Sequence, residues 1–333
     1  MRTSHDRARS LQEAFARFAP LVRKDLTKVR RNLDVLPKTA PHLLKKILEH
    51  SVMSPGKLMR PALVILGTQL HAKPNAGTIL VATGMELLHI ASLIHDDTVD
   101  EAALRRGRKT VARTWGSQLA VLTGDYVFAS AAKFVCDTGS IQLVRRFAET
   151  IMDLSSGELM ERFSAFNPNQ KWPDYQDRIF KKTASLFAAS AESSALLHNA
   201  SLETISALRS YGTNMGMAFQ IVDDILDFTG ASDAFGKPVG QDLANGTLTL
   251  PSILLLEQYP KQNPIKALFA QEDIESNLRW ALEMVNNSTV IKDSYTVANH
   301  YRDKAIKSLD LFPDLLPKEA LIEMAEYALS RDR

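Results

Sequence analysis

Apolar residues recur along most of the chain at the three- and four-residue spacing of helices that bury one face. The pattern predicts an amphipathic helix from Met1 to Pro20, with an apolar face formed by Leu11, Phe15 and Phe18. It predicts further helices over residues 42–52, 61–71, 77–100, 117–136, 141–164, 175–199 and 202–228, and helical periodicity resumes at Pro251 and continues to the end of the chain.

Alternation of apolar and polar residues is nowhere sustained long enough to predict a sheet. We therefore expect an all-α fold, one large helical bundle that spans residues 1–333 as a single domain. Within it, residues 1–35 form an N-terminal helix that packs on the bundle or on a dimer partner. Pro37 and Pro41 are expected to break the chain before the helix over residues 42–52.

Composition narrows the class of protein. The 333 residues are 45% apolar and 23% charged, enough to bury a large core, and a formal net charge of +2 gives no reason to expect a nucleic-acid partner. The single cysteine, Cys136, excludes an internal disulfide and indicates a reducing compartment. Glu86, His89 and the aspartates interrupt the longest apolar stretches, so we expect no transmembrane span and a soluble, cytoplasmic protein.

Two acid clusters of identical spacing each follow an apolar run: Asp96, Asp97 and Asp100, and Asp223, Asp224 and Asp227. On a helix the first and last carboxylates of each cluster share a face and repel each other, so a cation should offset the charge. Carboxylates without neighbouring His or Cys ligands suit Mg²⁺ rather than zinc or copper. A single such cluster is more often a solvated helix face, but two copies after inward-facing apolar residues point to a metal site.

Basic residues near turns and helix ends supply the opposite charge that a metal-bridged polyphosphate would need. His89 lies two helical turns before Asp96 and faces the same side, whereas we interpret His95 as structural. The candidate cations are Lys57, Arg60, Arg105, Arg106, Lys181, Lys182 and Lys237.

These motifs, in this order from Gly56 to the C-terminus, resemble those of the trans-prenyltransferases, the polyprenyl diphosphate synthases. The shared set is Gly56-Lys57-x-x-Arg60-Pro61, Glu86 to His89, both D-D-x-x-D clusters, Arg105-Arg106-Gly107, Lys182-Thr183, Gln220 and Gly236-Lys237. The resemblance implies an isoprenoid synthase-like bundle around a central cavity. It also implies a Mg²⁺-dependent reaction, with Mn²⁺ as a substitute, in which an allylic diphosphate ionises and isopentenyl diphosphate attacks the cation.

The resemblance also implies a role for each residue. Asp96, Asp100 and Asp223 would be the principal Mg²⁺ ligands, supported by Asp97, Asp224 and Asp227; Arg105, Lys182, Thr183, Gln220 and Lys237 would hold the allylic diphosphate; Lys57, Arg60, His89 and Arg106 would hold isopentenyl diphosphate. The catalytic set would be Asp96, Asp97, Asp100, Lys182, Asp223, Asp224 and Lys237. Thr247 departs from the pattern, because many members have a lysine there.

Product length should depend on Ala91 and Ser92, which precede Asp96 by about 6–7.5 Å along the helix. Short-chain members resemble one another in placing an aromatic residue there, so the small side chains predict a product longer than farnesyl, in the heptaprenyl to decaprenyl range. Phe128 or Phe134 would be a deeper block. We expect a homodimer. The alternatives are a geranylgeranyl diphosphate synthase, a catalytic subunit that needs a small partner subunit, a terpene cyclase or head-to-head synthase, and a non-catalytic partner.

Overall fold

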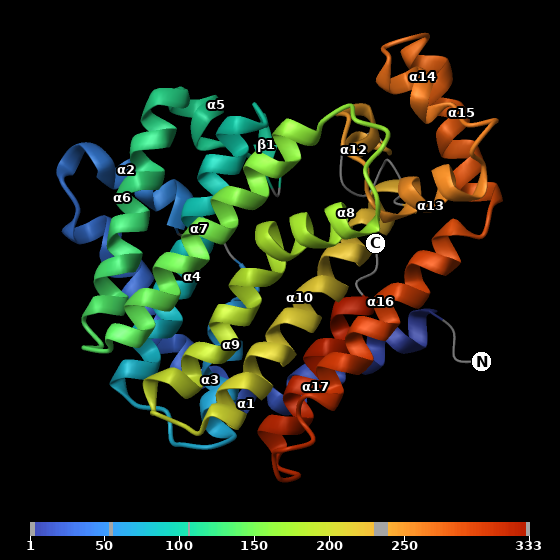
Figure 1. The fold of residues 1–333 in the computed structure, drawn as a ribbon. Helices are drawn as coiled ribbons and strands as arrows, with labels where there is room; N and C mark the ends of the chain where they lie inside the picture. Colours follow the sequence, from blue (N-terminus) through green and yellow to red (C-terminus); the bar gives the residue numbers. More distant parts are fainter. Residues whose placement is uncertain (1–3, 53–55, 106, 230–238, 331–333) are drawn as a thin grey trace.

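The computed structural model describes residues 4–52, 56–105, 107–229 and 239–330, with side chains from Phe18 onward. It confirms the all-α prediction (Figure 1). The first half contains α1 (Ser4–Thr39), α2 (His42–Val52), α3 (Met59–Gln69), α4 (Ala76–Val99), α5 (Val111–Trp115), α6 (Ser117–Cys136) and α7 (Ile141–Ser164). The second half contains α8 (Trp172–Ile179), the π-helix η1 (Phe180–Ala184), α9 (Ser185–Leu197), α10 (Leu202–Thr229), α12 (Gln241–Ala244), α13 (Leu250–Gln258), α14 (Ile265–Phe269), α15 (Ile274–Asn287), α16 (Val290–Lys307) and α17 (Leu316–Leu329).

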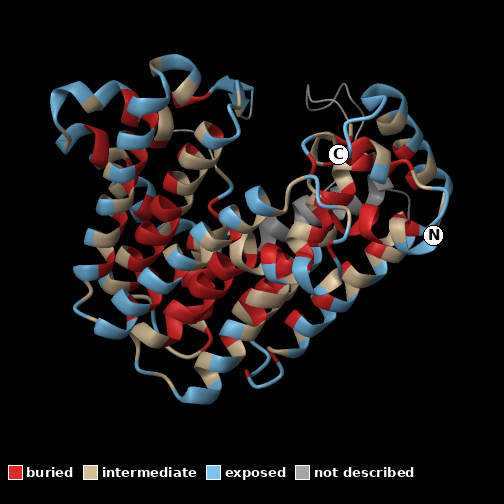
Figure 2. Cartoon of the chain, turned by 45° about the horizontal axis from the view of Figure 1, so that its top comes forward, coloured by how far each residue is buried: buried red, intermediate tan, exposed pale blue. Residues whose placement is uncertain are grey.

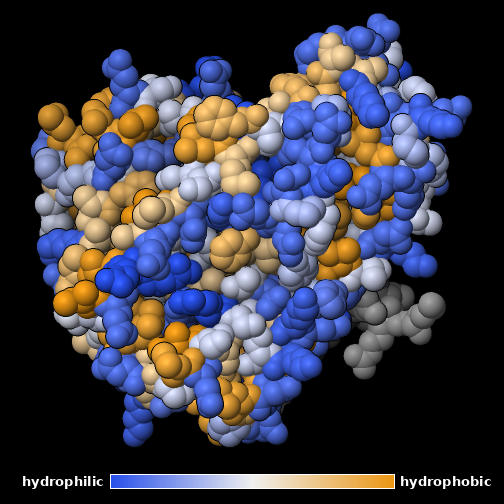
Figure 3. Space-filling model, in the orientation of Figure 1, coloured by the Kyte–Doolittle hydropathy of each residue, from blue (hydrophilic) through white to orange (hydrophobic). Residues whose placement is uncertain are grey.

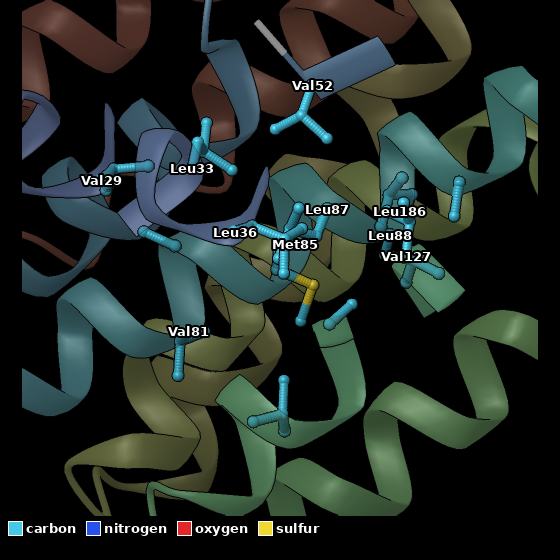
Figure 4. Close-up of a cluster of buried hydrophobic side chains, with 14 of the residues drawn as sticks. Val29, Leu33, Leu36, Val52, Val81, Met85, Leu87, Leu88, Val127 and Leu186 are labelled. Carbon is cyan, nitrogen blue, oxygen red and sulfur yellow. The ribbon is translucent and has the colours of Figure 1, made fainter. Parts of the chain in front are cut away.

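Helix α4 lies in the core because apolar residues surround it on nearly every side. Its side chains at Val81, Met85, Leu87 and Leu88 have no exposed surface. Figure 4 shows them among side chains from α1, α2, α6 and α9. Burial of each such residue stabilises the fold by about 1.5–3 kcal/mol, so the C-terminal end of α4 has a rigid support.

Helix α10 is the second core helix, and it packs against α9 on one side and α16 on another. Tyr211, Met215, Ile221 and Ile225 along it are fully buried. Figure 2 shows the buried residues concentrated in these inner helices and the exposed ones at the ends and outer faces. Both acid clusters therefore project from the ends of firmly packed helices.

Three local features differ from the sequence-based expectations. Helix α1 continues through Pro20 and Pro37 to Thr39, because Pro removes only one backbone donor and the following amide of Ala40 still reaches the carbonyl of Leu36 at 3.1 Å. The predicted helix over residues 175–199 is interrupted by η1. A two-stranded antiparallel hairpin, β1 (Leu104–Arg105) and β2 (Arg108–Lys109), follows α4 and is too short to show alternation in the sequence.

By length and composition, α4 and α6 would each be able to cross a membrane. In α4, 67% of the most apolar window is buried inside the molecule, as in the core helix of a soluble protein. In α6 only 33% is buried, which leaves an exposed apolar face.

Candidate active site

The first acid cluster, Asp96, Asp97 and Asp100, lies at the C-terminal end of α4. The unsatisfied carbonyls of a helix C-terminus carry partial negative charge, so carboxylates there need cations nearby. Arg105 Nε of β1 donates to Asp97 Oδ1 at 2.6 Å, and Arg162 Nη2 of α7 donates to Asp100 Oδ1 at 2.9 Å. These contacts fix the cluster between the hairpin and α7.

Asp96 remains poorly compensated despite these cations. Burial and the neighbouring Glu158 carboxylate raise its pKa to about 7, although Lys182 and Arg105 act in the opposite direction. A carboxyl with so high a pKa gains stability from an additional positive charge. A divalent cation at this position would supply it.

Lys182 is presented by the π-helix η1 and lies across from α7. Its Nζ is 2.9 Å from Glu158 Oε2 and 2.5 Å from Glu161 Oε1. Burial alone would lower the pKa of Lys182, but these two carboxylates more than offset it and the pKa lies above its usual value. The close approach of η1 to α7 requires a glycine at position 157, because a Cβ on Gly157 would lie 2.4 Å from the backbone nitrogen of Lys182.

The second acid cluster lies at the C-terminal end of α10, and its central residue, Asp224, is buried. Tyr175 OH donates to Asp224 Oδ2 at 2.6 Å and Gln220 Nε2 donates to Oδ1 at 2.8 Å. Thr183 Oγ1 of η1 donates in turn to Gln220 Oε1 at 2.6 Å. Burial raises the pKa of Asp224 to about 7, and the hydrogen bonds only partly counter this effect. Asp223 beside it is half-buried.

Asp227 has a different role from its neighbours. Its two carboxylate oxygens accept the backbone N–H groups of Gln241, at 3.2 Å, and Asp242, at 3.1 Å. It therefore caps the first turn of α12 and places Asp242 beside the second cluster. Burial and the carboxylates of Asp227, Asp224 and Glu161 raise the pKa of Asp242 well above its ordinary value.

One cation acts on carboxylates at both acid clusters. Lys182 lowers the pKa of both Asp96, at the first cluster, and Asp242, beside the second. Among the residues that the structure describes, no three His, Cys, Asp or Glu side chains form a ready-made metal cluster. Mg²⁺ usually takes one or two protein carboxylates and completes its coordination with water and substrate phosphate oxygens. The carboxylate donors and their raised pKa values fit such an ion.

The remaining predicted substrate-binding residues have separate environments. His89 lines a cavity together with Glu86, Asp97 and Arg105, between α1, α2, α4 and the hairpin. Lys57 Nζ donates to Tyr327 OH on α17, and the guanidinium of Arg60 stacks 4.5 Å from the centre of the Phe187 ring on α9. The predicted residues Arg106 and Lys237 lie outside the described residues.

The predicted length-determining residues occupy different environments. Ala91 is fully buried in the cluster that surrounds α4. Ser92 is half-buried, and its hydroxyl donates to the His89 carbonyl at 2.9 Å. Phe128 packs 5.3 Å from the ring of His95, which also lies against Gly124. His95 therefore joins α4 to α6, in agreement with its interpretation as structural.

Sequence reasoning missed several residues that the fold brings to the site: Glu158, Glu161 and Arg162 of α7, Tyr175 and Arg178 of α8, and Asp242 of α12. The available signal was Gly157-Glu158-Leu159-Met160-Glu161, a glycine and two acids on a helix whose neighbours are mixed polar and apolar. In the sequence alone this segment cannot be recognised as part of the site, because its role depends on the position of Lys182. Asp242 was hidden in the loop that was expected between residues 229 and 249.

Comparisons with known proteins identify the family of the chain. The polyprenyl synthetase family model matches residues 41–292. A prenyl transferase from Synechocystis sp. is 36% identical over 94% of this chain and 97% of its own, and heptaprenyl diphosphate synthase component 2 from Geobacillus stearothermophilus is 33% identical over 92% and 96%.

Solved structures show the same likeness. Heptaprenyl diphosphate synthase from Staphylococcus aureus has a TM-score of 0.89 and 32% identity, covering 94% of this chain and 99% of that one. The polyprenyl synthase from Caulobacter crescentus, solved with calcium and isoprenyl diphosphate, has a TM-score of 0.87 and 31% identity, covering 95% and 97%. The chain therefore belongs to the polyprenyl synthetase family and is a trans-prenyltransferase with the all-α isoprenoid synthase fold.

Proposed function

We propose that the two acid clusters and Lys182 form the centre at which an allylic diphosphate ionises and condenses with isopentenyl diphosphate to give a trans-polyprenyl diphosphate. The observation that carries the proposal is that Lys182, paired with Glu158 and Glu161, lowers the pKa of both Asp96 at the first cluster and Asp242 beside the second. A site rich in both carboxylates and cations suits a substrate bound partly through metal and partly through side chains.

Mg²⁺ is the proposed metal, with Asp96, Asp100 and Asp223 as principal ligands, and Mn²⁺ would substitute. When bound, the metal withdraws electron density from the diphosphate and makes it a better leaving group. Asp97 and Asp224 support these ligands. Asp227, whose oxygens accept two backbone amides, supports them by holding α12 in place.

Two sets of the chain's cations would hold the two diphosphates. Arg105 and Lys182 would stabilise the departing diphosphate as charge develops on it. The hydroxyl of Thr183 donates its single proton to Gln220, so it would join them only after turning away from Gln220. Lys57, Arg60 and His89 would hold isopentenyl diphosphate so that its double bond faces the allylic carbon. The buried apolar side chains of α4 would exclude water from the carbocation. Lys237 would also hold the allylic diphosphate, and Arg106 would also hold isopentenyl diphosphate.

The test is a condensation assay with purified protein, Mg²⁺, farnesyl diphosphate and isopentenyl diphosphate. We expect elongation in the wild type and a loss of about 10³-fold or more in Asp96→Asn, because one metal contact contributes several kcal/mol to transition-state stabilisation. Asp137→Asn, an exposed aspartate paired with Lys133 at the end of α6, is the matched control and should keep full activity. An active Asp96→Asn enzyme would contradict the metal assignment.

The product is proposed to be longer than farnesyl, in the heptaprenyl to decaprenyl range. The similarity to a heptaprenyl synthase supports this length, as do the small side chains of Ala91 and Ser92. We expect Ser92→Phe to shorten the product, and chromatographic sizing of the chains measures the change. A wild-type product confined to farnesyl or geranylgeranyl lengths would refute the assignment.

We also propose that the enzyme is cytoplasmic and works as a homodimer through α6 and α7. Exposed apolar residues gather on these neighbouring helices: Leu119 and Leu122 of α6, and Met152, Leu159 and Phe163 of α7. They are the α6–α7 patch, and Figure 3 shows hydrophobic side chains on this side of the molecule.

The similarity to a heptaprenyl synthase component 2 keeps a second, different subunit as the alternative partner. If purified protein is inactive until a second chain is added, the alternative holds.

A further inference from the structure

Tyr175 of α8 is fully buried, yet its hydroxyl is used in a specific contact. The hydroxyl donates to Asp224 Oδ2 at 2.6 Å, while Gln220 Nε2 donates to Oδ1 at 2.8 Å. With one donor on each oxygen, the carboxylate plane of Asp224 has a single orientation. The second lone pair of each oxygen remains as an acceptor.

The contact has consequences beyond Asp224. Because the amide nitrogen of Gln220 points to Asp224, its oxygen faces η1 and accepts the hydroxyl of Thr183 at 2.6 Å. The hydrogen bonds thus run continuously from Thr183 through Gln220 to Asp224, where Tyr175 ends the chain. They join η1, α10 and α8 at the point where the metal and the allylic diphosphate are proposed to meet.

The Tyr175 ring is itself held in place. The guanidinium of Arg178, one turn later on α8, lies 5.7 Å from its centre. Arg178 Nη1 donates to Gln170 Oε1 at 2.8 Å, and Nη2 donates to the Leu248 carbonyl. The ring of Trp172 lies 5.7 Å away on another side. Moving the hydroxyl oxygen away from Asp224 would require the ring to move and these contacts to break.

We propose that Tyr175 is a positioning residue of the condensation reaction, which orients Asp224 directly and, through that carboxylate, the amide of Gln220. The proposal rests on the proposed function of this site. Tyr175 does not touch the substrate in this role, and its effect reaches the reaction through metal binding. Residues that orient a metal-binding carboxylate in this way commonly contribute about 10- to 100-fold to metal affinity or activity.

Tyr175→Phe removes the hydroxyl and keeps the buried ring. We expect the half-saturating Mg²⁺ concentration to rise about tenfold or more, and the KM for isopentenyl diphosphate to stay unchanged because Lys57, Arg60 and His89 are untouched. A direct readout is the Kd for Mn²⁺ in the presence of inorganic diphosphate, measured by electron paramagnetic resonance. We expect the same increase there, without any turnover.

Tyr211→Phe is the matched control. Tyr211 is also fully buried, and its hydroxyl donates at 2.6 Å, but to the Leu321 carbonyl and at a place remote from Asp224 on α10. It should lower the melting temperature as Tyr175→Phe does and leave the Mn²⁺ Kd unchanged. In an Asp224→Asn background, Tyr175→Phe should change the Mn²⁺ Kd no further, because the residue acts through that carboxylate.

The outcomes separate this inference from the function it rests on. If wild-type protein elongates farnesyl diphosphate and both tyrosine variants bind Mn²⁺ equally well, Tyr175 has only a structural role and the inference is overturned. An additive effect in the Asp224→Asn background overturns it too. If wild-type protein does not elongate the primer with Mg²⁺, either alone or with a second chain added, the proposed function fails first and the inference fails with it.

Discussion

Several cations of the site pair with carboxylates that belong to the same proposed reaction centre. Arg105 pairs with Asp97, Arg162 with Asp100, and Lys182 with two glutamates. While each charge is paired, burying it destabilises the fold little. A stronger partner for either member of a pair would displace the other member. Metal would take the carboxylates and diphosphate would take the cations, so substrate and metal binding should favour each other.

The raised pKa values of Asp96 and Asp224 give a prediction for pH. Both are about 7 in the folded protein, against 3.8 for an ordinary aspartate. The folded state therefore binds more protons than the unfolded state between pH 4 and 7, and the free energy of unfolding falls as pH rises through this window. We expect the melting temperature in EDTA to fall from pH 5 to pH 8.

Mg²⁺ with inorganic diphosphate should reverse this fall, more at pH 8 than at pH 5, because protons and metal compete for the same carboxylates. Thermal melts across this range, with and without the ions, measure both effects. Asp96→Asn should weaken the dependence in EDTA, since one of the carboxyls with a raised pKa no longer titrates. A melting temperature in EDTA that does not change with pH would contradict the predicted protonation.

The sequence was sufficient to find the aspartates but not their partners. The D-D-x-x-D spacing is visible locally, since i and i+4 residues share a helix face whatever the tertiary fold. The pairing of Lys182 with Glu158 and Glu161 joins residues 21 or more positions apart. Whether such residues meet depends on how α7 and η1 pack, which no local pattern determines.

Among the elements, the π-helix η1 is the one that shapes the site most directly. Wide turns of this kind are uncommon and occur at functional sites. Here η1 places Lys182 and Thr183 toward α7 and α10, and Gly157 of α7 allows the close approach. We predict that Gly157→Ala disrupts this arrangement, because the new Cβ would lie 2.4 Å from the Lys182 nitrogen and 2.8 Å from its Cα.

The backbone of η1 would have to shift, and forcing an extra methyl group into a packed region costs about 1–3 kcal/mol. We expect a lower melting temperature together with a several-fold higher KM for the allylic diphosphate. Ser155→Ala, at an exposed position of the same helix, is the control and should leave both unchanged. A Gly157→Ala enzyme with wild-type KM and stability would show that the approach of η1 is not required.

Element boundaries were predictable where the chain has strong stop signals. The bounds of α6 and α7 match the expectation at both ends. Between the two helices, Gly139 adopts a positive φ of 71°, which ends the turn after α6. The side chain of Ser140 then accepts the amide of Leu143 and caps the start of α7. The π-helix has no such signal, because the residues on either side of it, Ile179 and Ser185, are also helical. It was therefore predicted as part of one continuous α-helix.

At the scale of the whole molecule, α6 is an exception to the burial pattern. Its composition is apolar enough for a membrane span, yet only a third of its most apolar window is buried. Leu122 is 61% exposed and Phe163, on the adjacent α7, is 87% exposed. Exposed apolar residues gathered on two neighbouring helices are costly in water and mark an interaction site, and a second copy of the α6–α7 patch would be a self-complementary partner for it.

We therefore predict that charges placed in the α6–α7 patch separate the protomers. Light scattering should give a mass of twice 37.0 kDa for the wild type and 37.0 kDa for the double variant Leu122→Glu/Phe163→Glu. Leu202→Glu changes a leucine at the start of α10 that is even more exposed than Leu122, and it should leave the mass of the wild type unchanged. Because α7 carries Glu158, Glu161 and Arg162 on its inner side, loss of the partner should also loosen the support of Lys182 and lower kcat. If the monomeric variant is fully active, catalysis does not require the dimer. If the wild type is itself a monomer, the dimer prediction is wrong.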